Sequence, residues 1–371
     1  MKNKTACVLT SVHSVFDTRI FRKQAKSLIN AGYDVALIVQ HTEKEVIDGI
    51  TIIPLKKPNN RFKRIFSTTW QVYKKALKVD AGIYHFHDPE LIPVGLLLRM
   101  KGKKVIYDVH EDVPKQIMSK EWIWKPIRGF VSKVTNAIEK IADKFLTAVV
   151  SATPSIGEKF STDNIVVHNF PLLDELLLDD TIENENKDNI VTYVGGITSI
   201  RGIEEMVEAI GILAEDYQSK FLLAGKFSSK SLKERVKEMD GWSKVKFQGF
   251  INRGQVAENL AKAKAGLVLF HPLPNHIDAY PNKMFEYMSA GLPVIASDFP
   301  LWKEIIEGNE CGITVDPQKP EEIAAAIKYI FDNPEEARQM GQNGRRAVEE
   351  KYNWSIEEKK LLELYKRILE E

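Results

Sequence analysis

Short apolar segments of strand length alternate with longer amphipathic segments along almost all of this 371-residue chain. Such alternation predicts a parallel β-sheet with helices on both faces. The expected strands of the first half are residues 6–10, 35–39, 50–54, 83–87, 105–109, 146–150 and 165–168. The pattern then begins again, with the strand segments NIVTYVG, KFLLAG, KVKFQGF, GLVLF, PVIAS and CGITVD. The chain therefore carries the same α/β pattern twice.

The repetition predicts two domains, as does the length of the chain. An acidic, polar and weakly periodic stretch at 171–189 interrupts the pattern and suits a linker. We expect two doubly wound, Rossmann-like domains at 1–172 and 190–354 that face a central cleft, joined by a linker at 173–189. A final helix at 355–371 is expected to pack back on the first domain. Because doubly wound sheets bind ligands outside the carboxyl ends of their strands, this cleft predicts a two-substrate enzyme.

Charge is distributed unevenly along the chain. Residues 1–170 contain 27 Lys and Arg against 16 Asp and Glu, whereas the remainder contains 25 against 35. This difference indicates either distinct partners for the two halves or attraction between the domains. Cys7 and Cys311, the two cysteines, form neither a disulfide framework nor a zinc motif, so we expect a cytoplasmic protein. No apolar run is long enough to span a membrane, and any membrane contact is expected to be peripheral.

The segment YVGGITSIRG places two glycines at the end of an expected strand. Gly195 and Gly196 allow a tight turn, and the next helix is expected to begin near Gly202, with Arg201 beside it. Free amides and the positive end of the helix dipole make this turn either a phosphate site or an ordinary strand–helix connection with a solvated arginine. The chain contains neither a G-x-G-x-x-G motif nor a Walker A loop.

A second motif, DAYPNKMFEYMSAGLPVIASD, places carboxylates at Asp278 and Glu286. Pro281 suits the first turn of a helix, on which Lys283 and Glu286 then share a face. A lysine and a carboxylate beside a helix N-terminus are suited to binding a phosphate and a polyol together. Because apolar side chains flank Glu286 in the sequence, its burial without a partner would be costly.

This second motif resembles the signature of the large retaining glycosyltransferase family with the GT-B fold, known as family 4 or group 1. The family signature is an acidic residue, seven others and a glutamate, then a small-residue helix end and a Gly-x-Pro-Val-Ile strand. The segments HDPELIPVGLLL and KKVIYDVHED are similar to a bacterial branch of the family that builds surface glycans. The resemblance extends over nearly the whole chain and implies two Rossmann-like domains.

The resemblance implies roles for the residues of both second-half motifs. Glu286 matches the acid that binds the ribose hydroxyls of a nucleotide. Asp278 stands where the family usually has a glutamate that contacts the donor sugar. Gly196 and Arg201 stand where the family usually has Arg and Lys, so one cation is missing; we expect Lys283 either to replace it or to be a solvated lysine. The further residues expected around the donor are Gly195, Tyr280, Asn282, Phe250 and Ile251, the last two beside the base.

The resemblance also implies roles in the first half. His110, just past the strand VIYDV, matches a family histidine that contacts the donor sugar and its phosphate. The residues expected on the acceptor side are Asp17, Arg19, His87 and Asp88. Asp17 is equally suited to capping the helix that follows it. His85, His87, Asp88 and Glu90, together with His110 and Glu111, have side chains that metals bind, but the family's chemistry needs no metal, so none is expected.

Two segments, 59–78 and 119–144, are basic with interleaved Trp, Phe and Ile. They predict either contact with an anionic membrane or ordinary amphipathic helices that cover a sheet. Together with the basic first half they favour an anionic or lipid-linked acceptor. Nucleic acid is not expected, because no recognised binding module is present.

We therefore expect a metal-independent retaining glycosyltransferase, with hexosyltransferase-type chemistry, that moves a sugar from a nucleotide-diphospho-sugar to a glycan or lipid-linked acceptor in surface polysaccharide biosynthesis. A UDP-sugar is the favoured donor, followed by a GDP-sugar, and no prosthetic group is expected. The expected location is the cytoplasm. If the protein contacts a membrane, the expected surface is the inner face of the plasma membrane. The alternatives are a non-catalytic nucleotide-sugar-binding subunit and a nucleotide-sugar epimerase on the same fold.

Overall fold

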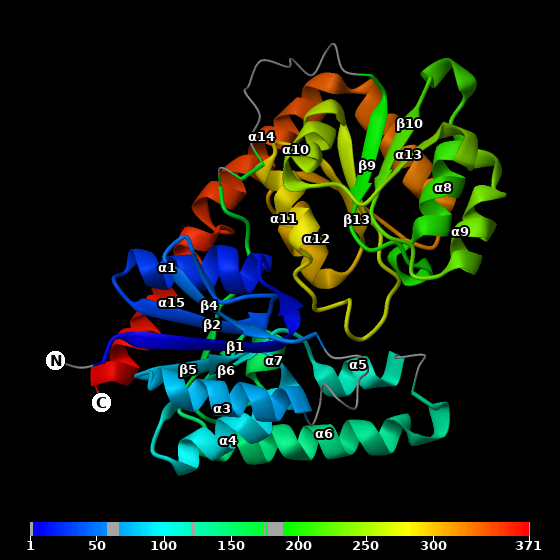
Figure 1. The fold of residues 1–371 in the computed structure, drawn as a ribbon. Coiled ribbons are helices and arrows are strands. Elements are labelled where there is room, and N and C mark those ends of the chain that lie inside the picture. The colour runs from blue at the N-terminus through cyan, green and yellow to red at the C-terminus, as the bar shows by residue number, and fades with distance from the viewer. Residues whose placement is uncertain (1–2, 58–66, 120–122, 174, 177–187, 371) are drawn as a thin grey trace. The chain divides into compact units, whose positions relative to one another are not determined.

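The computed structural model describes residues 3–57, 67–119, 123–173, 175–176 and 188–370. The chain divides into two compact units (Figure 1). Unit 1 comprises Met1–Asn169 and Trp354–Glu371, and unit 2 comprises Phe170–Asn353. Most of the predicted linker, and parts of both basic aromatic segments, lie outside the described residues. No helix among the described residues combines the length and the apolarity that a membrane span requires.

The sheet of unit 1 has eight strands in the order β3-β4-β2-β1-β5-β6-β7-β8. All neighbouring pairs are parallel except β3–β4. The strands are β1 (Thr5–Ser14), β2 (Asp34–Gln40), β3 (Glu45–Ile47), β4 (Ile50–Leu55), β5 (Ile83–Phe86), β6 (Lys104–Val109), β7 (Ala148–Ser151) and β8 (Asn164–Val166). All seven predicted strands are present; β3 was not predicted, because it is a three-residue edge strand without a buried side chain.

Helices cover both faces of this sheet (Figure 1). One face carries the π-helical segment η1 (Thr18–Ala25), α1 (Lys26–Asn30) and the final helix α15 (Trp354–Glu370). The other carries α3 (Thr69–Val79), α4 (Ile92–Met100) and α6 (Lys125–Phe145), with α5 (Val113–Ser119) packed against α6. The short α7 (Pro154–Gly157) joins β7 to β8. Helix α15 is fastened to unit 1 by polar contacts: Trp354 donates to the Ser27 hydroxyl at 2.9 Å, and Tyr365 is hydrogen-bonded to His85 at 2.9 Å.

The sheet of unit 2 has six parallel strands in the order β11-β10-β9-β12-β13-β14. They are β9 (Ile190–Val194), β10 (Lys220–Ala224), β11 (Val245–Gly249), β12 (Ala265–Val268), β13 (Val294–Ser297) and β14 (Gly312–Val315). Helices α8 (Ile203–Ile212), α9 (Lys230–Lys237) and α13 (Pro320–Asp332) share one apolar core. Helices α10 (Arg253–Lys262), α11 (Asn282–Ser289), α12 (Pro300–Ile306) and α14 (Pro334–Glu350) share the other.

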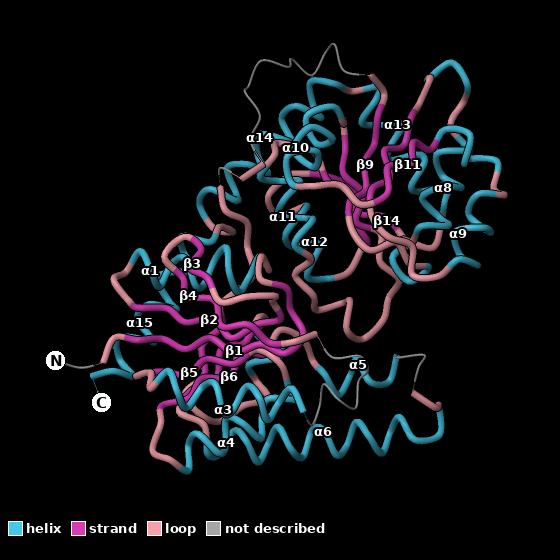
Figure 2. The backbone as a smooth tube through the Cα atoms, in the orientation of Figure 1, coloured by secondary structure: helices cyan, strands magenta, loops and turns pink. Residues whose placement is uncertain are grey.

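The strands of unit 2 are apolar on both sides because they supply both cores. In β10, Phe221 and Leu223 join the core under α8, whereas Leu222, between them, joins the core under α11. This alternation follows from the two-residue period of a strand and explains why the strand segments read as unbroken apolar runs. Each unit thus has helices on both faces of a largely parallel sheet (Figure 2), and the predicted doubly wound α/β class is confirmed.

Candidate functional site

In unit 2, the loop that leaves β9 is shaped by two glycines. Gly195 has a φ of +138°, which side chains rarely allow, and a Cβ placed there would lie 3.0 Å from the Nζ of Lys283. A Cβ on Gly196 would lie 2.9 Å from Nη1 of Arg201. Tyr193 donates a hydrogen bond to the Gly196 carbonyl at 2.7 Å and holds the turn in place. The absence of side chains at these two positions brings the backbone directly against two cations.

The two cations come from different elements and meet over the same ring. Lys283 lies in the first turn of α11, and its Nζ is 3.6 Å from the centroid of Tyr193 and 5.3 Å from that of Phe270. Arg201 lies in the turn before α8, and its Cζ is also 5.3 Å from the centroid of the Phe270 ring. Two positive charges so close together repel each other, so the arrangement favours an anion between or beside them.

Lys283 is 9% exposed, and its Nζ has no hydrogen-bond partner in the part of the chain that the structure describes. Burial first, and then the charge of Arg201, hold the pKa of this lysine well below its usual range, while Glu286 acts in the opposite direction. A buried ammonium group without an acceptor is costly, and its usual explanation is a missing anionic partner. An anion held here would supply both the acceptor and the opposite charge.

Glu286 lies one turn further along α11 and is 17% exposed. Its Oε1 accepts a hydrogen bond from Nη1 of Arg253 at 2.8 Å. Arg253 also binds both carboxylate oxygens of Glu175, at 3.1 and 2.8 Å. Among the described residues, the second oxygen of Glu286 accepts no hydrogen bond. The partner of Glu286 in this structure is therefore an arginine, and its predicted contact with a ribose stays a prediction.

Sequence reasoning missed Arg253, although a signal was available. Arg253 is the first residue of α10, directly after the N-cap Asn252. The positive end of the helix dipole disfavours a cation at this position. An arginine there indicates a specific anionic partner nearby, and the chain supplies two of them.

The remaining predicted donor residues lie in the segments that follow β11 and β12, on loops except for Asn282. Phe250 is 89% exposed after β11, and Ile251 beside it packs partly into the core under α11. Asp278 is exposed in the loop that follows β12. Tyr280 stacks on Phe285, with ring centroids 6.2 Å apart. Asn282 begins α11 after the N-cap Pro281, so this predicted helix start is present.

In unit 1, a buried carboxylate organises the carboxyl end of β6. Asp108 is fully buried, and Arg19 donates to its Oδ1 through Nη2 at 2.9 Å and through Nε at 3.2 Å. Arg19 also donates to the Val167 carbonyl at 2.9 Å. Burial raises the pKa of such a carboxyl, but Arg19 first, and then His110, outweigh it and hold the pKa of Asp108 well below its usual range. Arg19, predicted on the acceptor side, is itself buried and compensates this charge.

His110 is positioned by the same carboxylate. Its Nε2 lies 3.3 Å from Oδ1 of Asp108 and 3.1 Å from Nδ1 of His87. Burial lowers the pKa of His110 to about 4 against the opposing effect of Asp108, so the imidazole is neutral at pH 7. Because Nε2 faces the carboxylate, we assign the ring proton to Nε2. The other nitrogen, Nδ1, is then a hydrogen-bond acceptor for a ligand hydroxyl.

Two other predicted acceptor residues, Asp17 and Asp88, contact His13, which sequence reasoning missed. The Nδ1 of His13 donates to Asp17 at 2.9 Å, and its Nε2 lies 3.5 Å from Asp88. Burial disfavours the charged ring, but Asp17 and Asp88 outweigh it and raise the pKa of His13. Asp17 also caps η1, because its side chain accepts hydrogen bonds from two backbone amides in the first turn of that helix. Helix capping was one of the two roles predicted for Asp17. The histidine in the segment SVHS, at the end of an apolar strand, was the available signal.

Three side chains at the carboxyl end of β5 are buried: His85 within the strand, and His87 and Asp88 just after it. Asp88 accepts from the Thr10 hydroxyl at 2.8 Å and from the Ser11 amide at 2.6 Å. The ligand atoms of His85, His87 and Asp108 lie within 4.8 Å of one another, the spacing of a possible metal site. Arg19 already compensates the charge of Asp108, which disfavours a cation there. Asp88, Glu90 and Glu111, also considered as ligands from the sequence, are not part of this group.

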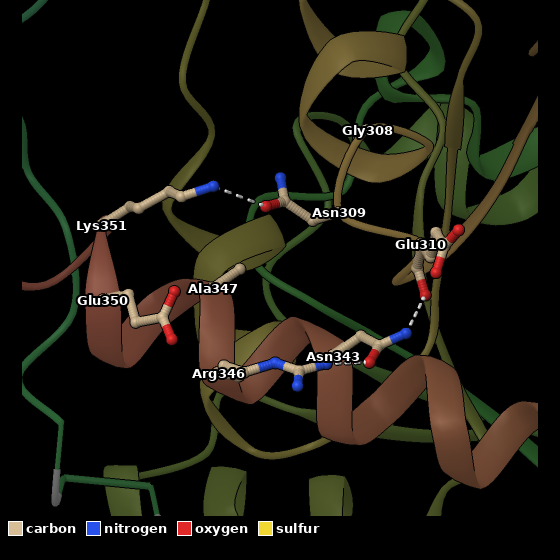
Figure 3. A pocket seen from close by; sticks show the side chains of 8 residues that line it. All are labelled: Gly308, Asn309, Glu310, Asn343, Arg346, Ala347, Glu350 and Lys351. Carbon is tan, nitrogen blue, oxygen red and sulfur yellow. Dashed lines mark hydrogen bonds between the residues drawn. The ribbon is translucent and has the colours of Figure 1, made fainter.

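A polar hollow elsewhere in unit 2 is unrelated to these residues (Figure 3). It lies between the loop that enters β14 and the end of α14, where Asn343 donates to the Glu310 carbonyl at 3.1 Å and Lys351 donates to Asn309 at 3.3 Å. That loop is at the amino end of its parallel strand, whereas Gly195 and Gly196 are at the carboxyl end of β9. The hollow contains none of the predicted site residues.

Comparisons with known proteins agree with this organisation. Residues 18–167 match the model of Glycosyltransferase Family 4, and residues 178–347 match Glycosyl transferases group 1. The chain is 22% identical to the capsular polysaccharide biosynthesis glycosyltransferase CapM of Staphylococcus aureus, over 66% of this chain and 68% of that protein.

Two solved structures have the same fold. Sucrose-phosphate synthase from Thermosynechococcus elongatus superposes with a TM-score of 0.78 at 21% identity, over 98% of both chains. HepE from Anabaena, in complex with UDP and glucose, superposes with a TM-score of 0.75 at 12% identity, over 98% of this chain and 99% of that one. The two family matches and this shared fold place the chain among the glycosyltransferases of the GT-B type.

Proposed function

We propose that this protein is a retaining glycosyltransferase that takes a sugar from a nucleotide-diphospho-sugar, with a UDP-sugar favoured over a GDP-sugar. The observation that carries the proposal is the Nζ of Lys283, which is buried without a hydrogen-bond partner among the described residues and lies beside the Gly195–Gly196 turn and Arg201. A diphosphate fits this arrangement, because its two anionic groups match two cations and the free amides of a glycine turn.

The rest of the nucleotide is proposed to lie on neighbouring loops of unit 2. Glu286 would bind the ribose hydroxyls through the carboxylate oxygen that has no hydrogen-bond donor among the described residues, with Arg253 holding the carboxylate in place. Phe250 and Ile251, at the end of β11, would lie beside the base, and Asp278 and Tyr280 near the sugar. The UDP bound in the HepE structure supports the choice of a uridine nucleotide.

Unit 1 is proposed to supply the acceptor side through Asp17, His87 and Asp88, and to contact the donor through His110. The neutral ring of His110 would accept a hydrogen bond from a sugar hydroxyl at Nδ1. The proposed acceptor is a glycan or a lipid-linked glycan of surface polysaccharide biosynthesis, at the inner face of the plasma membrane. The similarity to CapM supports this acceptor class.

The proposed reaction breaks the bond between C1 of the sugar and the oxygen of the β-phosphate, and forms a bond between C1 and the acceptor oxygen. The proton of the acceptor hydroxyl passes to the departing phosphate oxygen, so that a nucleoside diphosphate leaves. Negative charge grows on this leaving group as positive charge develops on the sugar. Arg201 and Lys283 would therefore stabilise the transition state more than the ground state, and the reaction would need no metal.

The test measures nucleoside diphosphate released from UDP-glucose and GDP-mannose by the full chain, with and without EDTA. We expect release from a UDP-sugar at a rate that EDTA leaves unchanged. The Lys283→Met variant should lose at least about 100-fold in kcat/KM, whereas Lys230→Met, at an exposed lysine of α9, should behave as wild type. Equal turnover by Lys283→Met and wild type would overturn the proposal.

A non-catalytic nucleotide-sugar-binding subunit is the second candidate. Two observations favour it: Gly196 offers no cation at the position where glycosyltransferases of the family that this chain resembles have an arginine, and Asp278 is exposed. A nucleoside diphosphate that raises the melting temperature of wild type but not of Lys283→Met, without any donor turnover, would favour this candidate.

A further inference from the structure

Helix α6 presents a continuous apolar stripe to solvent. Its exposed members are Ile127, Phe130, Val134, Ile138, Ile141 and Phe145, which are 41–70% exposed. They are spaced three or four residues apart and therefore lie on one face of the helix. Trp124, the N-cap residue, extends the stripe and is 71% exposed. Soluble proteins rarely expose so long an apolar row without a partner for it.

Lysines lie along one edge of this stripe. Lys133, Lys140 and Lys144 are exposed, and a helical repeat of 100° per residue places all three on the same side of the apolar row. None of them makes an ion pair with a carboxylate within the part of the chain that the structure describes. The exposed surface of α6 therefore combines large apolar side chains with unpaired positive charge.

The acidic residues of α6 point into unit 1 instead. Glu139 and Asp143 are 2% and 5% exposed. Asp143 accepts hydrogen bonds from the Ser161 hydroxyl at 2.6 Å and the Thr162 amide at 3.0 Å, and Glu139 lies 3.6 Å from the ammonium group of Lys159. These contacts fix which face of the helix is outside, so the apolar stripe and the lysines are a stable part of the surface.

The direction of α6 relates this surface to the acceptor side of unit 1. The chain leaves the carboxyl end of β6, where Asp108 and His110 lie, passes through α5 and then enters α6. Figure 1 shows α6 beside α4 and α5, on the face of the sheet away from α1 and α15. Helix α6 therefore begins, with Trp124 as its N-cap, near the carboxyl ends of the strands of unit 1, where His110 lies. From there the helix runs back towards the amino ends of these strands.

We propose that this face of α6 binds the surface of a membrane that contains anionic lipids, with the apolar stripe among the acyl chains and the three lysines at the headgroups. The inference rests on the proposed function, because a surface at this place would present a lipid-linked acceptor to the His110 side of unit 1. The charges favour a membrane over a dimer through this face. Lysines attract anionic headgroups, whereas α6 of a second copy has no exposed carboxylate with which the lysines could pair.

Sedimentation with vesicles tests the proposal on the full chain. We expect binding to vesicles of phosphatidylcholine with 30% phosphatidylglycerol that is at least about tenfold tighter than binding to phosphatidylcholine alone, and that weakens as salt is raised. Two double variants should each reduce this binding about tenfold or more: Phe130→Ser with Ile138→Ser, and Lys133→Glu with Lys140→Glu. The matched control, Lys230→Glu with Lys237→Glu on α9, should bind as wild type.

Three results would overturn the proposal. They are equal binding to both kinds of vesicle, α6 variants that bind as wild type, and a dimer in solution that the serine variant dissociates while vesicles stay unbound. A UDP thermal shift recorded on the same samples separates this inference from the proposed function. A retained shift without vesicle binding rejects only the membrane surface, whereas vesicle binding without any nucleotide effect rejects the proposed function.

Discussion

At the scale of single residues, Lys283 is the least expected feature of the molecule. The sequence indicated a cation at this position but left open whether it was solvated, and burial decides that question. The pairing of Arg253 with Glu286 could not be predicted, because it joins residues 33 positions apart through the packing of α10 and α11. His110 was predicted from a resemblance, whereas its contact with His87 depends on the register of β5 and β6.

Replacing Lys283 should stabilise the ligand-free protein. Met has a similar length and removes a buried charge without an acceptor, so Lys283→Met is expected to raise the free energy of unfolding at pH 7 by about 1–3 kcal/mol. The depressed pKa of Lys283 means that the unfolded chain binds more protons, so wild-type stability should rise with pH towards about 10, a slope that the variant should lack. Urea unfolding measures both effects. Destabilisation by Met would show that the lysine is satisfied as it stands.

The pKa of His110 predicts a pH effect on stability. Since burial lowers this pKa to about 4, the folded state binds fewer protons than the unfolded state between about pH 6.5 and pH 4. Stability should therefore fall as the pH drops through this range. Between pH 7 and pH 5, wild type is expected to lose about 2 kcal/mol more than His110→Asn. Denaturant titrations at the two pH values check this, and identical losses in the two proteins would contradict it.

At the scale of elements, the sequence predicted most of the fold because strands buried on both sides must be apolar along their whole length. It missed β3, which has no such requirement, and it could not show that the helix after β1 begins as a π-helix. The carboxyl ends of β1, β5 and β6 meet only through the strand order, so the network around Asp108 was beyond the reach of sequence pattern. This network ties η1 to β6 and, through the Val167 carbonyl, to the segment after β8.

Breaking the pair between Arg19 and Asp108 should loosen these elements together. Arg19→Met leaves a buried carboxylate without compensation and is expected to lower the free energy of unfolding by about 3–5 kcal/mol. The double variant Arg19→Met with Asp108→Asn removes the uncompensated charge as well, so its loss should be smaller than that of Arg19→Met alone. Urea unfolding of the two variants decides this. A double variant that is less stable than Arg19→Met would show that the charge pair is not the cause.

At the scale of the whole molecule, each unit carries its predicted functional residues at the carboxyl edge of its own sheet. Unit 2 gathers two cations, a glycine turn and Glu286, and unit 1 gathers His110 and the carboxylates around His13. The predicted α/β class followed from the repeated pattern, and the family matches cover both units. The basic first half includes the exposed lysines of α6, which gives part of that charge a definite place on the surface.

Isothermal titration calorimetry with UDP tests most directly whether the buried lysine and its neighbours form a diphosphate site. The measurement compares the wild-type protein with Lys283→Met. We predict that wild type binds UDP with at least about 100-fold higher affinity than Lys283→Met, a difference of about 2.7 kcal/mol, and binds uridine alone no better than the variant does. Equal affinity of the two proteins for UDP would contradict the account.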